Sequence, residues 1–213
     1  MDFLQRALVD LWKWRVASNP HTPPPVDVIV SIGYGTRARR LTSGNLASVW
    51  GARKLAWSFP EAHVIFSPAR HCFPGSEIVE ADLKNGHFLR PGDIRPDRVL
   101  LAAPSDNTVT EVESIKACLD ERRIAPRHIA VVCSEMHARS VRLIFKKLFP
   151  ESRVSVVTYD YLDEIDPSGP DPLSRSFALL VASHLARHIV LRVCGLRVTK
   201  LFKRPMSAGP RSS

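Results

Sequence analysis

Residues 128–149 constrain the fold most, because two different periodicities meet within this segment. Residues 129–133 form an apolar run without alternation, which is typical of a parallel strand covered on both faces. After Ser134 the apolar side chains recur at helical spacing, at Val141, Ile144, Phe145 and Leu148. The segment therefore predicts a buried strand that leads into an amphipathic helix, with Ser134 as the helix N-cap.

Further strands and helices alternate along the chain. We expect strands at residues 26–32, 63–67, 98–102 and 153–158, and helices at residues 3–16, 45–59, 107–123 and 174–193. Residues 68–97 are rich in proline, glycine and polar side chains, and we expect one short element near residues 78–83. This alternation predicts an α/β fold, a three-layer αβα Rossmann-like domain with a mainly parallel sheet of about five strands.

The chain divides into three parts. Residues 1–25 hold an N-terminal helix, with Leu4, Leu8 and Leu11 on one side, and a proline-rich link. Residues 26–193 are long enough for a single Rossmann-like domain. Residues 194–213 form a basic tail that we expect to be flexible.

The net charge of +9 is unevenly distributed. From Ser174 onward there are eight Lys or Arg residues and no acid, and 22 basic and 21 acidic residues precede that point. The basic end is either a solubilising tail or a weak contact for a polyanion, a membrane surface or an acidic partner. The oligomeric state does not follow from this pattern.

Targeting and metal-binding signals are missing from the sequence. The first fifteen residues carry several charged side chains, so they lack the apolar core of a signal peptide, and no stretch has the length of a membrane span. The four cysteines are widely spaced and form no zinc motif, and two of them lie in apolar surroundings, which suits reduced thiols. We therefore expect a cytoplasmic protein without a metal site.

Three polar turns follow predicted strands, at residues 33–40, 104–108 and 134–139. In doubly wound sheets a ligand lies beyond the carboxyl ends of the strands, where the strand order reverses. These three turns are therefore expected to line one cleft.

The first turn holds Gly33 and Gly35, which allow a sharp turn or close approach to a ligand. Ala38 stands where the dinucleotide fingerprint needs a third glycine, which argues against a nicotinamide or flavin cofactor and leaves the cofactor unknown. Arg37 and the arginines after it either bind a phosphate or form a solvated charge cluster.

The other two turns open helices. Asn107 either orients a ligand or only caps its helix, and Thr108 with Glu111 has the spacing of a capping box. In the third turn, Arg139 and the helix amides could hold an anion, and His137, kept neutral by the helix field, could act as acid or base. The alternative for these two residues is a surface histidine and a solvated charge.

The order of these pieces resembles a bacterial family of unknown function. The segments DVIVSIGYG, SDNTVTEVES and VVCSEMHARSVRLIF are similar to motifs of the family that includes SanA, YdcF and ElyC. The resemblance covers roughly residues 26–160 and implies a Rossmann-like fold with polar cleft residues at Asn107, Thr108, Glu111, His137 and Arg139, above a floor shaped by Gly33 and Gly35. The family's usual Ser-Gly-Gly turn is Ser67-Pro68-Ala69 here. Relatives are linked to cell-envelope processes.

These observations support a leading hypothesis and two alternatives. The leading one is a cleft that binds a small anionic molecule, phosphorylated or nucleotide-like, through Gly33, Gly35, Arg37, Ser134 and Arg139, with hydrolysis or group transfer assisted by His137. The first alternative is a non-catalytic binding or regulatory module. The second places the function in the basic end, which would bind a polyanion.

Overall fold

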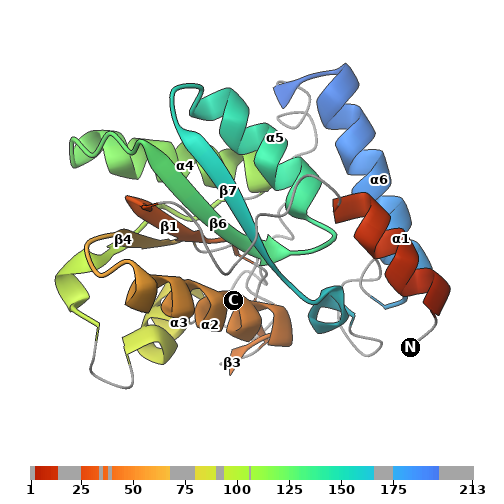
Figure 1. Cartoon of the computed structure of the whole chain (residues 1–213), viewed down its shortest axis with the longest axis horizontal. Coiled ribbons are helices and arrows are strands. Elements are labelled where there is room, and N and C mark those ends of the chain that lie inside the picture. Colours follow the sequence, from red (N-terminus) through yellow and green to blue (C-terminus); the bar gives the residue numbers. More distant parts are fainter. Residues whose placement is uncertain are drawn as a thin grey trace, which may run out of the picture.

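The computed structural model describes residues 3–13, 25–33, 36–37, 40–67, 80–89, 94–105, 107–165 and 175–196. Five parallel strands form the central sheet: β1 (Val28–Ser31), β4 (His63–Phe66), β5 (Val99–Leu101), β6 (His128–Ser134) and β7 (Arg153–Tyr159). Their order across the sheet is β5-β4-β1-β6-β7 (Figure 1). The expected parallel sheet of about five strands is confirmed.

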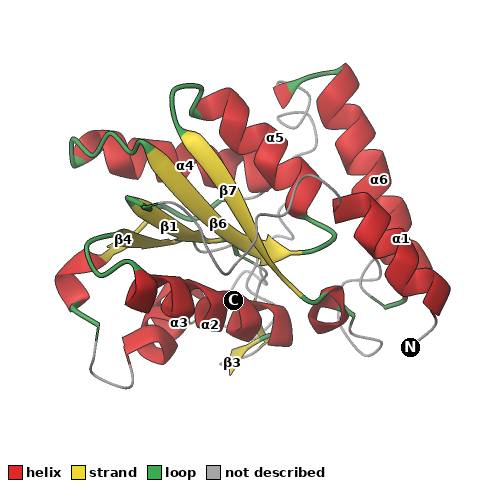
Figure 2. Ribbon diagram, viewed as in Figure 1, coloured by secondary structure: helices red, strands yellow, loops and turns green. Residues whose placement is uncertain are grey.

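Helices cover both faces of this sheet (Figure 2). They are α1 (Phe3–Lys13), α2 (Ser43–Ser58), α3 (Glu80–Leu89), α4 (Thr108–Glu121), α5 (Ala138–Leu148) and α6 (Phe177–Val193). One core cluster joins α2 and α3 to the sheet, and a second joins α4 and α5 to its opposite face. The structure therefore has the expected three-layer αβα arrangement, and none of the described helices is both long and apolar enough to cross a membrane.

Successive side chains of each strand point to opposite faces of the sheet and pack into the two cores in turn, as a sheet buried on both faces requires. Val131 and Cys133 of β6 pack toward α4 and α5, whereas Ala130 and Val132 pack toward α2 and α3. All seven residues of β6 are buried. This explains why the strand appears in the sequence as an uninterrupted apolar run.

Two buried arginines bind the carboxyl ends of helices. Arg53 in α2 donates to the Phe88 carbonyl oxygen in the last turn of α3, at 2.5 Å. Arg98 donates at 2.9 Å to the carbonyl oxygens of Phe59 and Ala62, which follow α2. Because the last carbonyls of a helix lack partners within it and carry partial negative charge, a guanidinium there is well placed. These contacts join α2 to α3 and to the start of β5.

A third core cluster lies beyond the carboxyl ends of β6 and β7. It contains Val9 from α1, Leu180 from α6, Met136 from the turn after β6 and Tyr161 from the 3-10 helix η2 (Tyr161–Glu164). Figure 1 shows α1 and α6 side by side at this end of the molecule, and the rings of Trp12 and His188 meet there at 5.6 Å. We call these two helices the α1–α6 cap.

Several local predictions need correction. Ser134 is not the N-cap of α5: it is the last residue of β6, and His137 holds the N-cap position. The short element expected near residues 78–83 is a longer helix, α3, which begins at Glu80 and has ten residues. The basic segment after β1 contains a short antiparallel hairpin of β2 (Thr36–Arg37) and β3 (Arg40–Leu41).

Candidate functional site

The topology locates the place where a ligand would bind. From β1 the chain adds β4 and then β5 on one side, and it returns to place β6 on the other side of β1. Neighbouring connections therefore leave in opposite directions at the carboxyl ends of β1 and β6. In open α/β sheets such a switch point opens a crevice for ligands. We call it the β1–β6 switch point.

The peptide group between Ile32 and Gly33, just after β1, is held from two sides. The Gly33 amide donates to the Glu111 carboxylate of α4 at 2.7 Å. The Lys84 ammonium of α3 donates to the Ile32 carbonyl oxygen at 2.9 Å. Both side chains are buried, with Lys84 at 0% and Glu111 at 5% exposure. Two charged groups from the two opposite helical layers thus fix the turn that the sequence singled out through Gly33.

Glu111 does not complete a capping box with Thr108, as the sequence spacing suggested. Asn107 is the N-cap of α4, and its side-chain oxygen accepts from the amides of Val109 at 2.9 Å and Thr110 at 3.1 Å. In return, the Asn107 amide donates a hydrogen bond to the Thr110 hydroxyl oxygen at 3.2 Å, which completes a capping box. Thr108 is the first, half-buried residue of α4. The box lies one residue earlier than predicted, and this leaves the Glu111 carboxylate for Gly33.

His137 lies in the third predicted turn, but the α1–α6 cap encloses it. Its ring is 5% exposed and meets the ring of His184 edge-on at 4.8 Å. The Arg187 guanidinium lies 2.9 Å from Nε2. Because a guanidinium only donates, Nε2 accepts, and the neutral ring carries its proton on Nδ1. Burial, followed by the charges of His184 and Arg187, places the pKa of His137 well below its ordinary value.

Arg139 binds the carboxyl end of α1. Its Nε donates to the Trp12 carbonyl oxygen, and a terminal nitrogen donates to the Leu11 carbonyl oxygen at 3.3 Å. The guanidinium also lies over the Trp12 ring, 5.2 Å from its centre. These contacts give Arg139 the same helix-capping role as Arg53 and Arg98. Its role in holding a ligand stays a prediction.

The structure describes only some of the remaining predicted site residues. Ser134 is fully buried, and its hydroxyl oxygen accepts from the His137 amide at 3.3 Å. Arg37 is a residue of strand β2 in the β2–β3 hairpin, which follows the switch-point turn. Gly35 lies outside the described residues. The structure therefore brings together Gly33 and Glu111, and separately Ser134 and His137.

Glu135 is a buried charged residue that the sequence interpretation missed. It is 4% exposed, and its carboxylate accepts from Arg6 at 2.6 and 3.0 Å and from Lys13. Hydrogen bonding to this carboxylate raises the pKa of Arg6 above its ordinary value. Sequence spacing offers no signal for this cluster, because Arg6 and Lys13 lie more than 120 positions from Glu135.

Neither of two surface hollows in the described structure contains a predicted site residue. One, of about 390 Å³, is lined by Arg142, Lys146 and Arg153 among others. The other, of about 350 Å³, is lined by Asp27 and His63 among others. Both lie near the amino ends of strands, opposite the switch point. Among the described residues, no group of three or more His, Cys, Asp or Glu side chains could hold a metal ion.

Comparisons with known proteins assign no family to this chain. No family model matches the sequence, and no curated protein is significantly similar to it.

Proposed function

We propose that this chain binds a small anionic molecule, phosphorylated or nucleotide-like, beyond the carboxyl ends of β1 and β6. The observation that carries the proposal is the Lys84 ammonium, which is fully buried and bound to the Ile32 carbonyl oxygen at the switch point. Burying a charge is costly, and charged groups kept inside a crevice are frequently functional. Lys84 places a positive charge at the switch point, and the Glu111 carboxylate lies on the other side of the same peptide group.

The surrounding backbone supports an anion rather than a cation. The β2–β3 hairpin, which contains Arg37 and Arg40, directly follows the switch-point turn. Helices α2, α4 and α5 each begin after a strand, so their amino ends lie at this edge of the sheet. Helix amino ends carry partial positive charge and favour anions.

The resemblance to the SanA, YdcF and ElyC family is part of this proposal. Two of the motifs that carry it contain Gly33 and Glu111, and these residues are hydrogen bonded to each other. That contact supports a shared cleft architecture. A cytoplasmic location belongs to the same proposal.

Binding fits the geometry better than catalysis. An acid or base must come within hydrogen-bond reach of its substrate, and His137 is enclosed by α6 and bound to Arg187. Arg139 binds main-chain oxygens of α1. We therefore favour a non-catalytic binding or regulatory module over a hydrolase or transferase that would use His137.

Isothermal titration calorimetry of the full chain with pyrophosphate and with adenosine 5′-monophosphate tests the proposal. We expect binding of at least one probe, and an affinity loss of roughly tenfold in Arg37→Ala/Arg40→Ala because charge-assisted hydrogen bonds to phosphate are lost. Arg95→Ala is the matched control, since Arg95 is an exposed arginine paired with Glu61 and Asp97 far from the hairpin. Absence of binding by both probes, or equal affinity in the double variant, would refute the proposal.

A further inference from the structure

The exposed apolar side chains of the described residues are concentrated on one part of the molecule. Twelve large hydrophobic side chains are exposed, and nine of them lie on α1, η2 or α6. These nine are Phe3, Leu4, Leu8, Leu11, Leu162, Leu179, Leu185, Ile189 and Val193. Single exposed hydrophobics are normal, but a concentration of this kind marks an interaction surface.

On α6 the exposed residues form a stripe at helical spacing. Leu179, Leu185, Ile189 and Val193 are 45–78% exposed, and the small residues Ala178, Ala182 and Ala186 continue the same side. The opposite side of the helix packs into the protein through Leu180, His184 and Leu191. The helix therefore buries one face and leaves a second apolar face uncovered.

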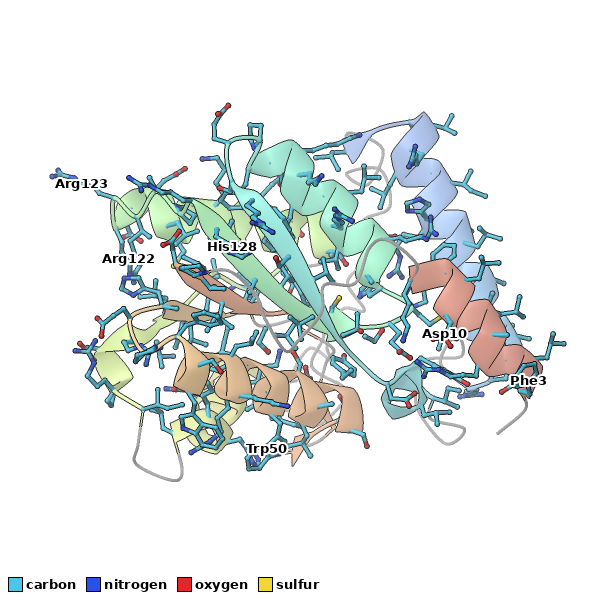
Figure 3. The ribbon with its side chains drawn as sticks, in the orientation of Figure 1. Phe3, Asp10, Trp50, Arg122, Arg123 and His128 are labelled. Carbon is cyan, nitrogen blue, oxygen red and sulfur yellow. The ribbon has the colours of Figure 1, made fainter. Side chains whose placement is uncertain are left out.

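Helix α1 also exposes large apolar side chains on one side. Phe3, Leu4, Leu8 and Leu11 are 48–86% exposed, whereas Val9 is buried. Figure 3 shows Phe3 at the outer end of the molecule. The cations of α1 point the other way, because Arg6 and Lys13 bind the buried Glu135. An amphipathic helix normally buries its apolar stripe, so the orientation of α1 needs a covering partner.

The charge around these stripes identifies the kind of partner. Arg192 is exposed on α6, and no acidic residue occurs from Ser174 to the end of the chain, where eight basic residues are found. A symmetric dimer through α6 would bring these like charges together. A nucleic acid would match the charge but would leave the apolar stripes in water. An anionic bilayer surface satisfies both features, because its interface accepts leucines and its headgroups attract arginines.

We propose that the α1–α6 cap is a docking surface for an anionic membrane, with the leucine and isoleucine stripe of α6 inserted at the interface. The two helices lie on the surface rather than across it. Headgroup attraction to Arg192 and to the basic residues after α6 strengthens the contact. The cap covers the carboxyl ends of β6 and β7, whereas the proposed anion site is built on the turn after β1, so docking does not depend on that site.

Vesicle co-sedimentation of the full chain tests this inference. We expect binding to phosphatidylcholine vesicles that contain about 30 mol % phosphatidylglycerol, little binding to pure phosphatidylcholine, and weaker binding as salt increases. Leu185→Glu/Ile189→Glu should lower the affinity by roughly tenfold or more, because it removes apolar contact and adds repulsion. Trp50→Glu is the matched control, since Trp50 is 56% exposed on α2, away from the cap, and it should bind like the original chain. Circular dichroism confirms that each variant is folded.

Several outcomes would overturn the inference. One is absence of binding to anionic vesicles by the folded full chain. Another is binding that disappears when residues 198–213 are deleted but is unchanged in Leu185→Glu/Ile189→Glu, because the tail alone would then be responsible. A stable dimer in light scattering, dissociated by the double variant and without vesicle binding, would show that a second copy covers the cap. Duplex DNA binding that survives the double variant, again without vesicle binding, would favour a nucleic acid.

Discussion

Among the described residues, His137 is one whose ionisation is tied to folding. Burial and the neighbouring His184 and Arg187 lower its pKa, whereas the unfolded chain has an ordinary histidine pKa of about 6.5. As the pH falls below that value, the unfolded chain takes up a proton that the folded chain excludes. The free energy of unfolding therefore decreases with falling pH in this window, and stability is complete above it.

This linkage predicts a difference between the original chain and His137→Gln. Glutamine can keep an oxygen acceptor for Arg187 but does not titrate. Urea unfolding followed by circular dichroism should show a smaller loss of stability between about pH 7.5 and pH 5.5 in the variant. His188 lies in the same cap and its pKa is also lowered by burial, so part of the pH dependence should remain. An identical loss in the two proteins would contradict the account of His137.

Residue-level prediction from sequence succeeded where the evidence was local and failed where partners were distant. Asn107 is a helix cap, as its position before an apolar helix suggested. Lys84 stood in a segment with weak periodicity, and Glu135 stood unremarked beside His137 in the third turn. Their partners are Ile32, Arg6 and Lys13, which only the folded topology brings near. No spacing rule within one element could identify them.

At the scale of elements, α2 lies so close to the sheet that a glycine is required at the contact. A Cβ atom added to Gly51 would be 2.7 Å from the Val132 Cγ1 atom of β6. Such an approach between heavy atoms is far inside van der Waals contact, so the Val132 side chain, the helix or the strand must move. Gly51 therefore sets the separation of α2 from the strand that adjoins the switch point.

We predict that Gly51→Ala lowers the free energy of unfolding by about 1–3 kcal/mol, the usual cost of an overpacked core. The loss should be smaller when Val132→Ala is introduced first, because the blocking methyl group is then absent. Gly86→Ala is the control: Gly86 is an exposed helix position with nothing within 4 Å of an added Cβ atom. There alanine should stabilise the helix by about 0.5–1 kcal/mol. Urea titrations would measure the original chain and the four variants, and a neutral Gly51→Ala would contradict the close contact.

Elements with a strong apolar pattern were predictable, and those held by tertiary contacts were not. The five strands follow from apolar runs because both faces of the sheet are buried. Helix α3 has few apolar residues and an internal glycine, and it is held instead by Arg53 at its carboxyl end and by Phe88 against Phe66. For α1 the helix was predicted correctly, but its leucine side is exposed rather than buried. Periodicity shows that a helix has two faces and does not say which face the protein covers.

In the whole molecule, two groups of contacts lie along the carboxyl edge of the sheet, one at β1 and one at β6 and β7. Around β1, side chains of α3 and α4 meet at the Ile32–Gly33 peptide. Around β6 and β7, α1 and α6 close over the third turn and enclose His137. The alternation of strands and helices predicts the layered architecture and the edge where ligands bind. The α1–α6 cap brings together two helices that lie more than 160 residues apart in the sequence. A pattern within either helix therefore could not predict their contact.

Nuclear magnetic resonance can locate the anion that we propose to bind at the β1–β6 switch point. The ¹⁵N-labelled full chain is titrated with pyrophosphate at constant ionic strength, and amide shifts are followed residue by residue. We predict saturable shifts that are largest for Gly33, Arg37 and Leu41 and small for residues 175–213. Shifts confined to residues 175–213, with Gly33 and the hairpin unchanged, would contradict the claim.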